Sequence, residues 1–175
     1  MARLRKFTCY RRMERPYTRI SKFKKKSYIR ADPAKGIVRF DMGDQRKQYT
    51  HEVSLISKVA LQIRSNALES ARQTSNRLLE KHLGPMGYFF KLRVHPHHIL
   101  RENKIAAGAG ADRFSTGMSH SFGIPIGTAA QVRKGQVIAA LQIEKQHLDL
   151  GMKAINRMRH KLPAECQVVV RELKK

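Results

Sequence analysis

The feature that most constrains this sequence is a dense run of positive charge at its N-terminal end. Residues 1–30 contain twelve lysines and arginines and a single acid, Glu14. Such a stretch repels itself and cannot form a core of its own unless a polyanion neutralises it. The excess continues along the chain, whose 175 residues carry a formal net charge of +23. Nucleic acid and an anionic membrane surface are the polyanions that fit this charge.

Five aromatic residues, at positions 7, 10, 17, 23 and 28, are interleaved with these cations. Aromatic rings stack on bases and sugars, while cations neutralise phosphates, so the mixture favours a nucleic-acid contact. A solvated tail is the alternative, but free tails favour Ser, Glu and Gly and rarely contain so many rings. Residues 1–35 are therefore predicted to be a basic nucleic-acid-binding extension. Its candidate contact residues are Arg3, Arg5, Lys6, Tyr10, Arg11, Arg12, Arg15, Tyr17, Arg19, Lys22, Lys24, Lys25, Lys26 and Arg30.

From residue 36 onward the pattern predicts a single globular domain that extends to residue 175. Hydrophobic residues make up 41% of the chain, which is enough for a core. Strands and two helices without regular βαβ alternation predict an α+β fold. Expected strands lie at 37–40, 52–59, 88–94, 128–132, 136–143 and 166–171, with helices at 61–83 and 148–162. The strands at 128–132 and 136–143 are expected to form a hairpin around Arg133, Lys134 and Gly135.

A long irregular stretch, at about 101–127, interrupts this domain. Loops of this length inside a compact domain are usually functional or disordered. Its centre, residues 106–111, contains only alanine and glycine, which let a backbone approach a ligand closely. Lys104 and Arg113 flank this centre, so a charged partner is expected.

Patterns for catalysis, cofactors or metals are weak. Gly108 and Gly110 resemble the start of a dinucleotide fingerprint, but Arg113 occupies the third glycine position and no helix pattern follows. His95, His97 and His98 surround a proline; on a strand the first two would share a face and His98 would point away. Without a nearby cysteine or carboxylate pair they make a poor metal site. Hydrogen bonds to RNA and ordinary packing both remain open for these histidines.

The expected compartment is the cytosol, and a membrane is not an expected partner. No stretch is long and apolar enough to cross a bilayer. A mitochondrial transit peptide would also be Arg-rich and acid-poor, but Pro16 and Pro33 interrupt any sustained amphipathic helix. Cys9 and Cys166 lie far apart and indicate neither a disulfide framework nor a zinc site.

An ordered series of short motifs runs through nearly the whole chain. It comprises residues 9–11, 15–18, 37–43, 66–72, 93–96, 110–113, 116–118, 122–123 and 135–138. Together these motifs resemble the large-subunit ribosomal protein L-ten-e family, the archaeal and eukaryotic branch of the universal L-sixteen family. The alanines at 106–107, Gly108 and the short C-terminal end indicate an archaeal-type member.

This resemblance implies a structural, ribosome-bound protein of the cytoplasm, not an enzyme. The implied fold is a sandwich of antiparallel strands with two helices. The implied partners are large-subunit ribosomal RNA, which the basic extension at 1–35 would bind, tRNA in the aminoacyl and peptidyl sites, and neighbouring ribosomal proteins. The internal loop would approach the peptidyl transferase centre and the tRNA acceptor end. Its candidate residues are Arg101, Asn103, Lys104, Gly108, Gly110, Asp112, Arg113 and Thr116.

The resemblance implies no cofactor, no metal, no small-molecule substrate and no catalytic residue. Another RNA-binding protein or an RNA-modifying enzyme is the alternative. A modifying enzyme would need a cofactor motif or a cluster of acids, and neither pattern occurs in the sequence.

Overall fold

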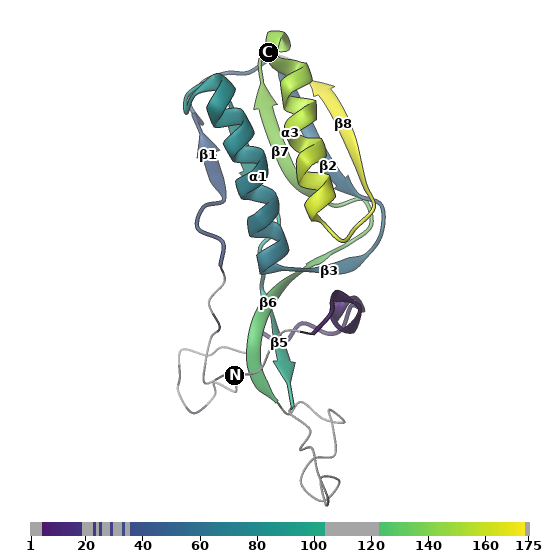
Figure 1. The fold of residues 1–175 in the computed structure, drawn as a ribbon. Coiled ribbons are helices and arrows are strands. Elements are labelled where there is room, and N and C mark those ends of the chain that lie inside the picture. The colour runs from purple at the N-terminus through teal and green to yellow at the C-terminus, as the bar shows by residue number, and fades with distance from the viewer. Residues whose placement is uncertain are drawn as a thin grey trace, which may run out of the picture.

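Two helices cover one face of a five-stranded sheet, and a three-stranded sheet continues from one end of it (Figure 1). The computed structural model describes residues 5–18, 23, 25, 29, 33, 36–103 and 123–173. The helices are α1 (Ser65–Leu83) and α3 (Leu148–Lys161). The strands are β1 (Asp41–Gly43), β2 (His51–Ser57), β3 (Leu61–Arg64), β4 (Phe89–Leu92), β5 (His98–Glu102), β6 (Ile124–Val132), β7 (Val137–Ile143) and β8 (Cys166–Glu172). The predicted α+β class with antiparallel strands and two helices is confirmed.

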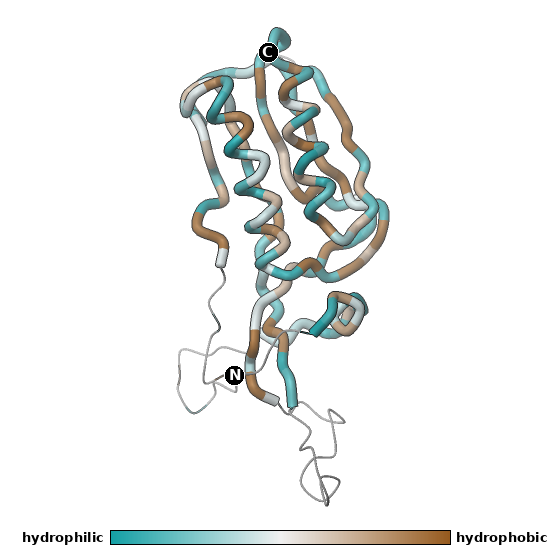
Figure 2. The backbone as a smooth tube through the Cα atoms, in the orientation of Figure 1, coloured by the Kyte–Doolittle hydropathy of each residue, from teal (hydrophilic) through white to brown (hydrophobic). Residues whose placement is uncertain are grey.

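The large sheet has the strand order β1-β4-β7-β2-β8, and every neighbouring pair is antiparallel. With α1 and α3 it forms what we call the body. Hydrophobic and hydrophilic stretches alternate along both helices, as amphipathic packing on a sheet requires (Figure 2). The fully buried side chains of the body include Val53, Leu55, Leu68, Leu79, Phe90, Leu141, Ile143, Ile155 and Met158. Their burial is the main source of the body's stability.

Helix α3 packs on β7 at Gly151, which is buried. A Cβ atom on Gly151 would lie 3.3 Å from Leu141 Cδ2 and 3.5 Å from two methyl groups of Ile143. The contacts with Ile143 would be ordinary van der Waals contacts, and the Leu141 methyl group would have to move by a few tenths of an ångström to admit a side chain. The two helices meet through a buried hydrogen bond, in which Ser75 Oγ donates to the Ala154 carbonyl at 2.9 Å.

The helix predicted at 61–83 begins four residues later, because residues 61–64 form β3. Leu61 pairs with Val132 and Ile63 with Ala130, so residues 61–64 form a strand beside β6 rather than the first turn of a helix. The predicted end is correct: α1 stops at Gly84, whose φ of +68° suits glycine and whose N–H donates to the Glu80 carbonyl.

The hairpin predicted for 128–143 is wrong. Strand β6 lies in the small sheet, of order β3-β6-β5, whereas β7 lies in the large sheet between β4 and β2. The turn at 133–136 exists, but it connects the two sheets. It is held to the end of β2, since the Gly135 N–H donates to the Ser57 carbonyl at 2.8 Å and the Ser57 N–H to the Gln136 carbonyl at 3.0 Å.

Two further predictions shift along the chain. The strand predicted at 37–40 forms at Asp41–Gly43, because β4 pairs there, Met42 opposite Phe90. The stretch at 101–127 is shorter than predicted, because β5 continues to Glu102 and β6 begins at Ile124, with these two residues paired. Residues 104–122, the centre of the predicted loop, lie outside the described residues. The other predicted strands and the second helix are confirmed with end shifts of a few residues.

Candidate nucleic-acid interface

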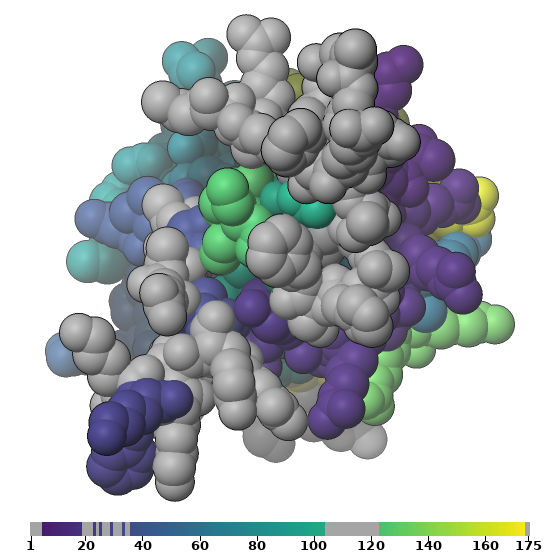
Figure 3. Space-filling model, turned by 90° about the horizontal axis from the view of Figure 1, so that it is seen from below, coloured from purple at the N-terminus to yellow at the C-terminus, as the bar shows by residue number. Residues whose placement is uncertain are grey.

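Residues 5–18, here called the N-terminal segment, are docked on the small sheet. Figure 3 views this end of the molecule and shows the described N-terminal residues (purple) along one side of it. Gln62 Nε2 donates to the backbone carbonyls of Tyr10 at 3.2 Å and of Arg12 at 2.5 Å. Gln131 Nε2 donates to the Glu14 carbonyl at 2.7 Å. These bonds hold the backbone, while the side chains of Arg11, Arg12 and Arg15 remain exposed.

The segment also pairs with the start of β5. The Tyr17 N–H donates to His98 Nδ1 at 2.9 Å, and the Ile99 N–H donates to the Tyr17 carbonyl at 3.2 Å. His98 is buried, and that burial lowers the pKa of its imidazole. The neutral imidazole is the form that can accept this bond at Nδ1, so His98 serves as an anchor for the N-terminal segment.

The three histidines have three different environments. Residues 93–97 are not a strand, so the expected geometry, with two of the histidines on one face, does not apply. The His95 ring stacks on Phe40 with centroids 5.2 Å apart, and His97 Nδ1 lies 3.0 Å from the His95 carbonyl oxygen. Across the described ranges, no group of three or more His, Cys, Asp or Glu side chains could hold a metal ion.

Two charged contacts join the N-terminal segment to the base of the 104–122 stretch. Arg5 Nε lies 2.7 Å from Glu102 Oε1, and this hydrogen bond raises the pKa of Arg5. The Arg101 guanidinium lies over the Tyr17 ring, 4.0 Å from its centroid, a cation–π contact. Arg101 therefore contacts the N-terminal segment, although we predicted it as a loop residue for tRNA.

In the described part of the predicted RNA surface, the lysines and arginines are exposed, whereas the tyrosine rings make contacts within the chain. Arg5, Lys6, Arg11, Arg12, Arg15 and Lys25 are exposed. Tyr10 and Tyr17 are half-buried: Tyr10 lies under the Arg64 guanidinium at 5.8 Å, and its hydroxyl accepts the Arg5 N–H. Both rings are thus involved in intramolecular contacts.

Several predicted residues cannot be placed. From the extension, Arg3, Arg19, Lys22, Lys24, Lys26 and Arg30 lie outside the described residues. From the loop, Asn103 is described and half-buried, whereas Lys104, Gly108, Gly110, Asp112, Arg113 and Thr116 lie outside.

Sequence reasoning missed the residues that hold the N-terminal segment in place. Gln62 and Gln131 are directly opposite each other on β3 and β6, and Gln131 Nε2 donates to Gln62 Oε1 at 3.3 Å. A glutamine within an otherwise apolar strand is a usable signal for a buried polar contact. Their partners are backbone carbonyls about 50 and 117 residues away in sequence, and no local pattern identifies those.

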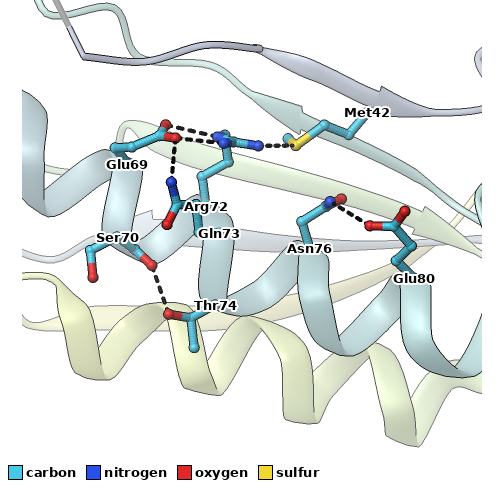
Figure 4. A network of polar contacts seen from close by, with 8 residues as sticks. All are labelled: Met42, Glu69, Ser70, Arg72, Gln73, Thr74, Asn76 and Glu80. Atoms are coloured by element: carbon cyan, nitrogen blue, oxygen red, sulfur yellow. Dashed lines mark hydrogen bonds and ion pairs between the residues drawn. The ribbon is translucent and has the colours of Figure 1, made fainter.

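A second polar cluster connects α1 to β1 (Figure 4). Arg72 is only 8% exposed; it forms a bidentate ion pair with Glu69 and donates to Met42 Sδ at 3.3 Å. The hydrogen bond from Arg72 lowers the pKa of Glu69. Gln73 donates to the same carboxylate at 2.9 Å. The cluster lies on a groove of about 330 Å³, and because each charge already has a partner it stabilises the fold rather than performing chemistry.

These features define a class of protein. Two antiparallel sheets, two helices on one face and outward-facing arginines on a docked segment are typical of a basic α+β protein that binds a nucleic acid. Within the described chain, neither helix has the length and apolarity needed to cross a bilayer.

Comparison with known proteins identifies the family. The family model described as Ribosomal protein L16p/L10e matches residues 15–169. The chain belongs to this family, and the resemblance inferred from its motifs is confirmed. It is therefore a structural ribosomal protein and not an enzyme.

Three archaeal relatives, each named large ribosomal subunit protein uL16, identify the chain as a large-subunit ribosomal protein of the archaeal type. One from Methanococcus maripaludis strain C7 is 46% identical over 168 residues, which cover 95% of this chain and 94% of that protein. One from Archaeoglobus fulgidus is 42% identical, covering 92% and 89%. One from Staphylothermus marinus is 42% identical, covering 98% and 95%.

Proposed function

We propose that the N-terminal segment binds large-subunit ribosomal RNA and that the 101–118 loop approaches the tRNA acceptor end near the peptidyl transferase centre. The single observation that carries the first half is the arrangement of the N-terminal segment. Its backbone is fixed by Gln62, Gln131 and His98, while Arg11, Arg12 and Arg15 remain exposed. The family resemblance supports the second half.

The mode of binding follows from the chemistry of RNA. Phosphate neutralisation by Lys and Arg releases condensed counterions and makes the affinity salt-dependent. The deep, narrow major groove of A-form RNA hides its base edges, so recognition relies on shape, 2′-hydroxyls and unpaired bases. A preorganised segment suits this mode of binding, because arginines on a backbone that is already held in place lose less conformational entropy on binding than arginines on a free tail.

The partners of the protein extend this proposal. We place it in the cytoplasm on the ribosome, beside the aminoacyl-tRNA path and next to other ribosomal proteins. The Arg5–Glu102 and Arg101–Tyr17 contacts support a mechanical link between its two regions. RNA bound to the N-terminal segment would then help to set the direction in which the loop leaves β5.

The first test compares two sets of cations. Replacing Arg11, Arg12 and Arg15 with Ala should lower the affinity for large-subunit RNA and reduce the slope of log affinity against log salt by about 2–3. The control replaces Arg46, Arg77 and Lys81, which are also exposed but lie on the body. Filter binding at several salt concentrations measures both. Equal losses in the two triple variants would contradict a localised RNA surface.

The loop half of the proposal needs translation as the readout. Deleting residues 106–111 should leave incorporation into the large subunit and the thermal midpoint unchanged, because alanine and glycine bury little apolar surface. Peptide synthesis should slow, because the strut beside the acceptor end is shortened. The role assigned to the loop would be refuted if the deletion variant failed to incorporate into the large subunit, or if it supported translation at the normal rate.

A further inference from the structure

A pocket of about 220 Å³ lies where the N-terminal segment meets the ends of the two helices. It is lined by Phe7, Arg64, Ala67, Lys161, Leu162 and Pro163. Figure 1 shows why three distant parts of the sequence meet there: α1 begins and α3 ends at the same end of the body, beside β3 and the 3-10 helix Phe7–Tyr10. None of these residues except Arg64 contributes to the contacts described above.

Two cations line this pocket without a carboxylate partner. Among the described residues, neither Arg64 nor Lys161 forms an ion pair with an acid. Arg64 Nη1 donates to the Arg5 carbonyl at 2.9 Å, but its Nε is buried and has no partner within the described chain. The first turn of α1 also contains no acid. The positive charge here is therefore not neutralised locally, and an incoming anion would find little competition.

The rest of the pocket is apolar. Phe7 contributes an aromatic ring, and Ala67, Leu162 and Pro163 contribute aliphatic surface. A pocket of about 220 Å³ is several times the volume of one water molecule, ~30 Å³. It is also smaller than the ~300–1,000 Å³ typical of sites for whole drug-sized ligands. The space suits one flat ring or one small charged group at a time.

Flat apolar surface beside unpaired cations matches one nucleotide of a single strand, whose base stacks while its phosphate pairs with Lys or Arg. The location agrees with this chemistry. Phe7 belongs to the N-terminal segment, and exposed Arg5 and Lys6 precede it directly. Two further basic residues on the last turn of α3, Arg159 and His160, adjoin Lys161.

We propose that this pocket binds one unpaired nucleotide of the large-subunit ribosomal RNA. Lys161 and Arg64 contact its phosphate, and the base lies against Phe7, Ala67 and Pro163. This inference rests on the proposed function and adds a defined base-binding site to a surface that otherwise neutralises phosphates. It assigns to the end of α3 a role in RNA recognition that the charge pattern of the N-terminal extension does not include.

The test separates charge from shape with two variants of the full-length chain. The Lys161→Ala variant removes a cation from the pocket, and the Lys153→Ala variant removes an exposed cation from the same helix outside it. The Ala67→Leu variant fills the pocket without changing charge, and Ala60→Leu adds the same bulk at an exposed position elsewhere. Thermal midpoints equal to the wild type confirm that each variant is folded.

The measurement is the affinity of the purified chain for isolated large-subunit ribosomal RNA, as a function of salt. Lys161→Ala should weaken binding more than Lys153→Ala and reduce the salt slope by about 1. Ala67→Leu should weaken binding by about tenfold, with the salt slope unchanged, because it blocks stacking rather than charge. Ala60→Leu should bind as the wild type does.

Crosslinking in assembled large subunits identifies the occupant. Ultraviolet crosslinks should join a peptide containing Phe7, or one containing Lys161 to Pro163, to a single nucleotide. Crosslinks from these peptides to another protein would overturn the proposal, as would Ala67→Leu protein that binds like Ala60→Leu. If the wild-type chain itself shows no salt-dependent RNA binding, then the proposed function fails, an outcome distinct from failure of the pocket alone.

Discussion

The body and the small sheet with its docked N-terminal segment are stabilised by different interactions. In the body, apolar side chains such as Leu55, Phe90 and Leu141 are completely buried between sheet and helices. At the other end, the N-terminal segment is attached by side-chain to backbone hydrogen bonds from Gln62 and Gln131 and by ion and ring contacts. Apolar packing involves no charged group, whereas the attachment of the N-terminal segment includes the Arg5–Glu102 ion pair, which salt screens, and the titratable His98.

This difference matches what a ribosomal protein needs. We expect the body to fold without RNA, because its apolar core is buried between the large sheet and the helices. The N-terminal segment carries its exposed arginines on a backbone that is held by individually modest bonds, on the order of 1 kcal/mol each. Under the proposed function, we expect RNA to replace some of these contacts without unfolding the body.

The largest expected effect tests the body. Phe90→Ala removes a fully buried ring from β4 and should lower the free energy of unfolding by about 3–5 kcal/mol, through lost apolar burial and a residual cavity. Denaturant unfolding measures this loss. Met86→Ala, at a 68% exposed position, is the control and should change stability by less than about 0.5 kcal/mol. A small loss at Phe90 would mean that the core can collapse around the gap.

An intermediate effect is expected where the N-terminal segment is attached. Gln62→Ala removes two hydrogen bonds to backbone carbonyls, those of Tyr10 and Arg12, so the segment should detach more often while the body stays folded. Limited trypsin digestion should cleave after Arg11 and Arg12 several-fold faster. Gln142→Ala on β7 is the matched control, since its side chain lies in the large sheet. Equal cleavage rates in the two variants would show that Gln62 does not anchor the segment.

The smallest expected effect is a dependence on pH through His98. Burial lowers the pKa of this imidazole below its ordinary value near 6.5, while Glu14 opposes the shift and His97 and Arg101 add to it. The native state therefore binds fewer protons than the unfolded state just below pH 6.5. The stabilisation by His98 is full above pH 6.5 and is lost as pH falls from there through the lowered pKa.

The measurement for His98 is hydrogen exchange of the Tyr17 and Ile99 amides between pH 7.5 and 5.5, corrected for intrinsic rates. Protection should decrease toward acid, because a protonated Nδ1 cannot accept the Tyr17 N–H. A His98→Gln variant, which keeps an acceptor but does not titrate, should lose this additional pH dependence. Equal pH profiles for variant and wild type would contradict the assignment.

Local sequence patterns correctly predicted elements that depend on neighbouring residues alone. They failed where pairing with a distant strand determined the secondary structure or the sheet. Helix α3 and the end of α1 follow from apolar spacing and from Gly84. Residues 61–64 were predicted as the start of a helix because Leu61 fits the apolar spacing of α1, but β6 pairs with them. The hairpin prediction failed for the same reason, since alternation shows that β6 and β7 are strands but not which neighbours they have.

The features of the candidate site can be separated in the same way, into those that the sequence predicts and those that depend on tertiary contacts. The exposed arginines of the N-terminal extension could be predicted, because charge density is a property of the sequence itself. The cation–π contacts of Tyr10 with Arg64 and of Tyr17 with Arg101 could not be predicted, because these two arginines lie on strands that are distant in sequence. Sequence patterns also left the histidines undecided between packing and RNA, and the structure assigns His98 to the attachment of the N-terminal segment.

The amino-acid sequence by itself determined the charge of this protein, its α+β class, the C-terminal ends of its helices and its family, because these depend on composition, local periodicity and ordered motifs. Only the tertiary structure decided which strands share a sheet and how residues 5–18 are held. It alone brought Phe7, Arg64 and Lys161 to one pocket. The physical reason is that strand pairing and long-range hydrogen bonds depend on which partners are in reach, and that is a property of the folded chain as a whole.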